Sequence, residues 1–147
     1  MKNLLLIIFL FISSCGYKPV YLVSNQNVLE FDKIILQGDE NINEILINNL
    51  GLKKDLSNKK SLTLNSNYTV TETSKDSKGQ VETYRSAIKV ELIITENNKV
   101  LYTKDFLAEF SYKNESSKYE LANYQSQIKD NLIIKLTEEI VLFLNLT

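Results

Sequence analysis

The sequence has no histidine and no tryptophan, and only one cysteine and one proline in 147 residues. Without histidine there is no imidazole to act as a general base, and no Cys–His nucleophile pair can form. A single cysteine cannot close an internal disulfide or supply a Cys/His metal site. The four glycines are isolated from one another, so no glycine-rich phosphate loop exists. We therefore expect no catalytic residues, no bound metal and no dissociable cofactor.

The chain also lacks an excess of charge of either sign. Its 17 basic and 18 acidic residues give a formal net charge of −1. A general nucleic-acid-binding protein needs a net basic surface to neutralise phosphates. Nucleic acid is therefore not an expected partner.

The longest hydrophobic run lies at the N-terminus. Residues 4–12 are all apolar and follow Lys2, but this run is shorter than the ~20 residues that cross a bilayer. A short apolar run behind a positive charge is typical of a secretory signal peptide. The following Ile12-Ser13-Ser14-Cys15 resembles the bacterial lipobox, in which the cysteine is acylated and becomes the new N-terminus.

We therefore predict a lipoprotein signal peptide over residues 1–14, cleaved between Ser14 and Cys15. Cys15 would carry a diacylglyceryl group and an N-acyl chain, enough lipid to hold the protein on a membrane. Residues 15–30 would be the lipidated tether, and residues 31–147 a single domain. The alternative is an ordinary signal peptide followed by a chance cysteine.

Hydrophobic periodicity predicts an α+β domain with the order β-α-β-β-β-α. Strands are expected at residues 31–36, 61–73, 81–95 and 100–112, and helices at residues 42–50 and 117–146. Asp39 or Asn41 can cap the first helix, Gly51 can end it, and Ser117-x-x-Glu120 matches a capping box for the second. We expect a four-stranded mixed sheet with both helices packed on one face.

One face of the predicted sheet is polar. Arg85, Lys89 and Glu91 alternate with apolar residues along one strand, and Glu109 lies on the next, where it is expected to face Glu91. The simpler interpretation is a solvated face with weak ion pairs. The other interpretation is that Arg85 and Lys89 form a surface for a partner or an anionic ligand.

Two segments resemble a known family. Cys15-Gly16-Tyr17-Lys18-Pro19-Val20-Tyr21 is similar to the start of LptE, the lipopolysaccharide-assembly lipoprotein family. The segment Phe110-Ser111-Tyr112-Lys113-Asn114-Glu115-Ser116-Ser117-Lys118-Tyr119 is similar to the one that leads into the last helix of alphaproteobacterial members. The last helix departs from the family pattern, because it is rich in Ile, Leu and Asn where members often have Ala and Arg.

The resemblance implies a lipid-anchored protein on the periplasmic side of the outer membrane. Such proteins plug the LptD β-barrel, help it assemble and assist lipopolysaccharide transport to the outer leaflet. Gly16 agrees with this location, since Asp after the cysteine would favour inner-membrane retention in the enterobacterial sorting pattern. Two alternatives remain open: an accessory lipoprotein of an ABC-type envelope lipid-transport system, and a lipoprotein hydrolase that uses Asp or Glu.

Overall fold

The computed structural model describes residues 29–146. The predicted cleavage and lipidation residues, Ser14 and Cys15, lie outside the described residues, as does nearly all of the predicted tether. The described elements are β1 Glu30–Phe31, β2 Lys33–Gly38, α2 Glu40–Leu50, β3 Lys53–Lys54, β4 Lys60–Lys75, β5 Val81–Glu96, β6 Lys99–Lys113 and α3 Lys118–Leu144.

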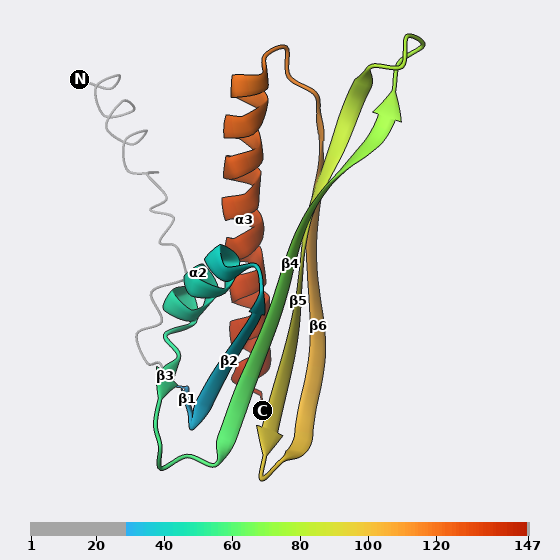
Figure 1. Ribbon diagram of the computed structural model, residues 1–147. Helices are drawn as coiled ribbons and strands as arrows, with labels where there is room; N and C mark the ends of the chain where they lie inside the picture. Colours follow the sequence, from blue (N-terminus) through green and yellow to red (C-terminus); the bar gives the residue numbers. More distant parts are fainter. Residues whose placement is uncertain (1–28, 147) are drawn as a thin grey trace, which may run out of the picture.

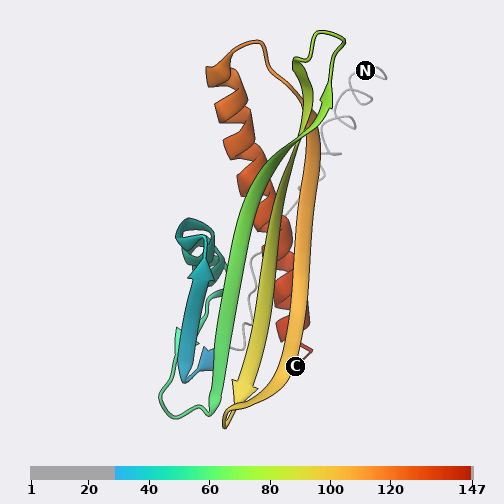
Figure 2. The same cartoon turned by 45° about the vertical axis from the view of Figure 1, so that its right-hand side comes forward.

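The main sheet has the strand order β2-β4-β5-β6, and it confirms the predicted four-stranded mixed sheet. β2 runs parallel to β4, whereas β4, β5 and β6 form an antiparallel meander. Both helices lie on the same face of this sheet, with α3 along β5 and β6 and α2 beside β2 and β4 (Figure 1). The opposite face of the sheet is left open (Figure 2).

The core lies between the helices and the inner face of the sheet. α3 contributes Ile128, Leu132, Ile133, Leu136, Ile140 and Leu144, and α2 contributes Ile42, Leu46 and Leu50. Every second residue of the meander faces them: Leu62, Leu64, Ile88, Val90, Leu92, Ile94, Phe106 and Ala108. This alternation is the period of two that a sheet with one covered face requires.

The predicted helix ends are confirmed by their caps. The Asp39 carboxylate accepts a hydrogen bond from the Ile42 amide at 3.0 Å, and Gly51 closes α2 in the left-handed conformation at φ 62°. The Ser117 hydroxyl accepts from the Glu120 amide at 3.1 Å, which is the N-cap half of the predicted capping box, and the Glu120 carboxylate accepts from the Ser117 hydroxyl at 3.1 Å.

The first predicted strand differs from the structure. It is divided at Asp32 into β1, which pairs with β3 in a separate two-stranded parallel sheet, and β2, which joins the main sheet. The Asp32 amide donates to the Lys60 carbonyl at 2.8 Å, at the point where the chain changes partner. Leu36 on β2 is 41% exposed, because β2 is a short edge strand.

The strands of the β4–β5 hairpin continue beyond the core. In both views the hairpin extends to the end of the molecule opposite the β5–β6 turn and bends away from α3 (Figures 1 and 2). The sheet and the first half of α3 therefore diverge toward this end (Figures 1 and 2).

Candidate functional site

The open face of the sheet carries Arg85 and Lys89, the two residues singled out as a partner or ligand surface. Both are exposed on β5, and each lies beside a carboxylate of β6. Lys89 Nζ is 2.8 Å from Asp105 Oδ2, and Arg85 Nη1 is 3.9 Å from Glu109 Oε2. The Arg85 Nε also donates to the Ser111 hydroxyl at 3.4 Å.

These contacts are exposed ion pairs. The hydrogen bond to Asp105 and the charge of that carboxylate raise the pKa of Lys89 above its usual value. About half of each side chain remains accessible to solvent, so each pair contributes little to stability. The geometry agrees with the simpler interpretation of a solvated polar face, while contact of Arg85 and Lys89 with a partner or ligand stays a prediction.

The expected pairing of Glu91 with Glu109 is wrong. In the observed register Glu91 lies opposite Asp105, and Glu109 lies opposite Ala87. The difference is four residues along β6, and it follows from the two-residue turn between β5 and β6 together with the irregularity beside Ile94. The carboxylate opposite Glu91 is therefore that of Asp105, which is also the ion-pair partner of Lys89.

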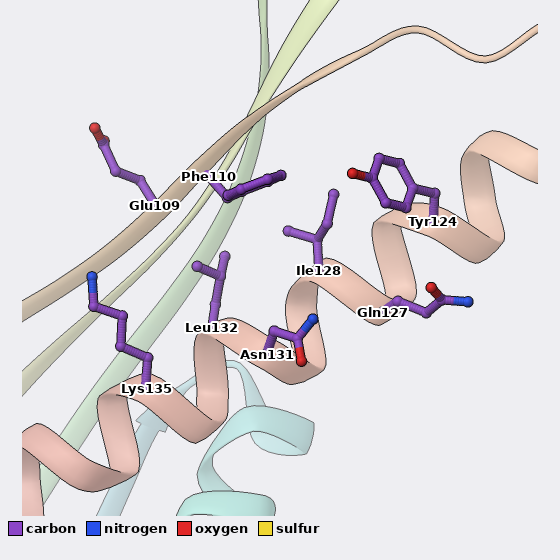
Figure 3. Close-up of a pocket in the computed structure, with 8 residues that line it drawn as sticks. All are labelled: Glu109, Phe110, Tyr124, Gln127, Ile128, Asn131, Leu132 and Lys135. Atoms are coloured by element: carbon purple, nitrogen blue, oxygen red, sulfur yellow. The ribbon is translucent and has the colours of Figure 1, made fainter. Parts of the chain in front are cut away.

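A pocket of about 330 Å³ lies between the edge strand β6 and the middle of α3. Its apolar wall is formed by Phe110, Tyr124, Ile128 and Leu132 (Figure 3). Gln127, Asn131 and Lys135 follow one another at steps of four along α3 and form its polar border, with Glu109 on the opposite side. The Lys135 side chain extends toward the β6 side of the pocket (Figure 3).

The pocket exists because α3 diverges from the sheet at this level. Phe110 points to the helix side of the sheet but is 49% exposed, whereas Phe106, four residues earlier on the same side of β6, is 5% exposed. A half-exposed aromatic ring beside buried aliphatic side chains can hold an apolar chain. A lysine at the border can hold an anionic group of the same ligand, so the pocket suits an anionic amphiphile.

A chain of hydroxyl groups and aromatic rings holds the upper wall of this pocket. The Ser86 hydroxyl is within 3.1 Å of both the Tyr68 and the Tyr112 hydroxyls. The Tyr112 ring meets the Tyr124 ring edge-on, with 5.6 Å between centroids. These contacts fix Tyr124 relative to β5 and β6, and therefore fix one side of the pocket.

Sequence reasoning missed this pocket. The polar stripe Gln127, Asn131, Lys135 is visible in the sequence at helical spacing, but so are other polar stripes of α3. What distinguishes this stripe is its position opposite Phe110, and that position depends on how α3 crosses the sheet. Packing of this kind is a property of the tertiary structure.

Two further findings concern the described residues. Between residues 29 and 146 there is no group of Asp or Glu side chains that could hold a metal ion. None of the helices in this part of the chain is both long enough and apolar enough to pass through a bilayer.

The fold is shared with solved bacterial lipoproteins. The structure is similar to rare lipoprotein B from Shewanella oneidensis, with a TM-score of 0.61, 13% identity, and coverage of 77% of this chain and 93% of that chain. It is also similar to an uncharacterized lipoprotein B from Nitrosomonas europaea, with a TM-score of 0.55, 10% identity, and coverage of 80% and 86%.

A third similar structure is a putative lipoprotein from Caulobacter crescentus CB15, with a TM-score of 0.53 and 13% identity, covering 76% of this chain and 86% of that chain. No protein-family model matches the sequence, and no curated protein matches it significantly. At these identities the similarity establishes a common fold.

Proposed function

We propose that this chain is an outer-membrane lipoprotein, anchored on the periplasmic side through acyl chains on Cys15, that plugs and helps assemble an LptD-type β-barrel and assists lipopolysaccharide transport. The motif at residues 15–21 supports the family, and the fold shared with solved lipoproteins supports the class of protein. The proposal assigns no enzymatic activity to the domain.

The observation that carries the proposal is the pocket between β6 and α3. Lipopolysaccharide combines acyl chains with phosphate groups. Phe110, Ile128 and Leu132 offer an apolar wall for part of an acyl chain, and Lys135 offers a cation for a phosphate (Figure 3). The volume of about 330 Å³ fits part of one such molecule, so the pocket would act as a transient contact for a passing lipid.

The open face of the sheet suits the interior of a barrel. The lumens of transmembrane barrels are polar. Threonine and asparagine line this face on β4, and β5 and β6 add the ion pairs of Arg85 and Lys89. The outer edge of β6 has no strand partner within the described residues, so a barrel wall beside it would protect this edge.

Affinity purification from membranes tests the partner. The full chain, tagged after residue 147, is extracted in mild detergent and the bound proteins are identified by mass spectrometry. We expect an outer-membrane barrel of the LptD type in about equal amount. Recovery with ATPase subunits from the inner membrane would instead support the ABC-type accessory role and contradict the proposal.

Photo-crosslinking tests the ligand. A photoreactive phenylalanine analogue at Phe110 faces the pocket, whereas the same analogue at Leu107 lies on the same strand but faces the open side. The two positions are similarly exposed, at 49% and 56%. We expect lipopolysaccharide adducts at Phe110, a reduction of at least about fivefold when Lys135→Glu is added, and few adducts at Leu107. Equal labelling at both positions would count against a pocket for lipopolysaccharide.

A further inference from the structure

We infer that one end of the domain docks against the surface of an anionic lipid bilayer. This basal end comprises Leu56 and Lys59 in the β3–β4 loop, Lys60 at the start of β4, and Lys99 and Val100 at the start of β6. The inference takes the acyl anchor on Cys15 from the proposed function, but the surface itself is separate from the pocket between β6 and α3.

The topology brings these residues to one end of the molecule. β2 and β4 are parallel, so both begin at this end, and β6 begins there as well because β5 runs back between them. The β3–β4 loop and the β5–β6 turn are accordingly the two lowest features of the ribbon in both views (Figures 1 and 2). A flat surface could touch both at once.

Leu56 is 78% exposed in the β3–β4 loop, whose conformation is fixed by hydrogen bonds. The Asp55 carboxylate accepts hydrogen bonds from the Ser57 amide at 2.9 Å and the Ser57 hydroxyl at 2.7 Å, which lowers the pKa of Asp55. The Asn58 side chain donates to the Glu30 carbonyl at 2.7 Å. These bonds fix the loop while leaving its one apolar side chain in solvent.

The second loop presents an apolar side chain in the same way. Asn97 and Asn98 adopt φ values of 50° and 63°, which form the tight turn between β5 and β6. Val100 directly after the turn is 62% exposed. The end of α3 reaches the same region. There the Phe143 ring meets the Tyr102 ring edge-on, with 6.3 Å between centroids, and Leu142 is 66% exposed.

Lysines outnumber carboxylates in the strand ends and loops at this end of the sheet, residues 29–33, 53–60 and 96–100. The lysines are Lys33, Lys53, Lys54, Lys59, Lys60 and Lys99, and the carboxylates are Glu30, Asp32, Asp55 and Glu96. Within residues 29–146 none of these lysines forms an ion pair with a carboxylate. Lysines that surround exposed leucine and valine are typical of a surface that lies in the headgroup region of an anionic membrane.

The chain also enters the domain at this end. The Lys53 amide donates to the Leu29 carbonyl at 3.1 Å, so the first described residue lies beside β3 and the loop that carries Leu56. Residues 16–28 join it to Cys15 and can span at most about 45 Å at ~3.5 Å per residue. An acylated Cys15 would therefore hold the domain within this distance of the bilayer and so at a high effective concentration.

Spin labels on the full lipidated chain test the docking. Once Cys15 is acylated, a cysteine introduced elsewhere is the only free thiol in the protein. Nitroxide labels are placed at Leu56→Cys, Val100→Cys and, at the opposite hairpin end, Lys78→Cys. The protein is reconstituted in vesicles of three parts phosphatidylethanolamine to one part phosphatidylglycerol, and collisions with oxygen and with a water-soluble nickel chelate are measured.

For each label we compare the collision rate with oxygen to the collision rate with the nickel chelate. We expect this ratio to be at least about threefold higher for the labels at Leu56 and Val100 than for the label at Lys78. Lys59→Glu with Lys60→Glu should reverse this preference at Leu56, since anionic headgroups would then repel the loop. Lys78→Glu with Lys113→Glu is the matched control and should leave it unchanged. Neutral phosphatidylcholine vesicles should reduce the preference in the same way as the charge reversal.

Labels at Leu56 and Val100 that remain as accessible to nickel as the label at Lys78 would overturn the docking surface. Labels shielded from both reagents would also overturn it, because the tether or a second protein would then cover this end. Mass spectrometry of Cys15 tests the anchor separately. If that cysteine is not acylated, the labels are measured after Cys15→Ala. A preference of the labels for oxygen would then support the docking surface and contradict the acyl anchor.

Discussion

At the scale of single residues, Gly38 shows how closely β2 approaches β4. It ends β2 with φ 83°, a conformation that residues with a side chain rarely adopt. A Cβ atom placed there would lie 1.8 Å from the Ser66 carbonyl oxygen, which is the acceptor for the Asp39 amide at 2.9 Å. Glycine at this position therefore joins the end of the strand to the N-cap of α2.

Gly38→Ala should accordingly lower the free energy of unfolding by about 3 kcal/mol, because both strain and a backbone clash are introduced. Gly79→Ala is the matched control. Gly79 has nearly the same φ, 80°, but its added Cβ would meet nothing within 4 Å. The free energy of unfolding should therefore fall by only about 1 kcal/mol. Urea unfolding followed by circular dichroism measures both, and equal losses would show that the contact with Ser66 is unimportant.

At the scale of secondary-structure elements, α3 depends on its first turn. Ser117 and Ser116 both donate to the Glu120 carboxylate, but only Ser117 also accepts from the backbone, at the Glu120 amide. Satisfying that amide is what an N-cap contributes to a helix.

Ser117→Ala should therefore destabilise the protein by about 1 kcal/mol, whereas Ser116→Ala should change stability by less than about 0.5 kcal/mol. Thermal unfolding of the two variants provides the comparison. Similar shifts in Tm for both would indicate that the carboxylate contacts, and not the cap, stabilise the start of α3.

Local chemistry explains which elements the sequence predicts well. The alternation along β4 and β5 and the caps at Asp39, Gly51 and Ser117 depend on neighbouring residues only, and these elements are confirmed. The division of the first strand at Asp32 depends on a distant partner, β3, and was missed.

The candidate site was less predictable than the fold. Placing Arg85 and Lys89 on one polar face required only the period of a strand, and this part is confirmed. The pairing of Glu91 depended on the exact turn and register of β6, and the pocket depended on where α3 diverges from Phe110. Both are consequences of packing between elements that are distant in sequence.

At the scale of the whole molecule, the domain has one polar sheet face, one amphiphilic pocket and one end rich in lysine and exposed apolar residues. These surfaces lie on different sides of one core. A single anchor at one end would leave the pocket and the polar face free for other molecules. The proposed acylation of Cys15 would therefore hold the domain at the membrane while its other surfaces stay accessible to other molecules.

Cys15→Ser should abolish acylation and signal cleavage, because the hydroxyl cannot replace the thiol in the lipidation reaction. Each buried methylene contributes ~0.8 kcal/mol to membrane binding, so we expect at least about a tenfold loss of the mature protein from outer-membrane fractions. Labelled palmitate and membrane fractionation measure the two effects. Ser13→Ala keeps a small residue before the cysteine and should behave as the unaltered chain does.

The position of α3 after the meander also bears on biosynthesis. Ile88, Val90 and Leu92 belong to the core that this helix covers, and α3 follows β4, β5 and β6 in the chain. A nascent chain that already has β4, β5 and β6 would thus expose an uncovered apolar sheet until residues 118–144 arrive. Truncation within α3 would therefore leave a chain prone to aggregation and proteolysis.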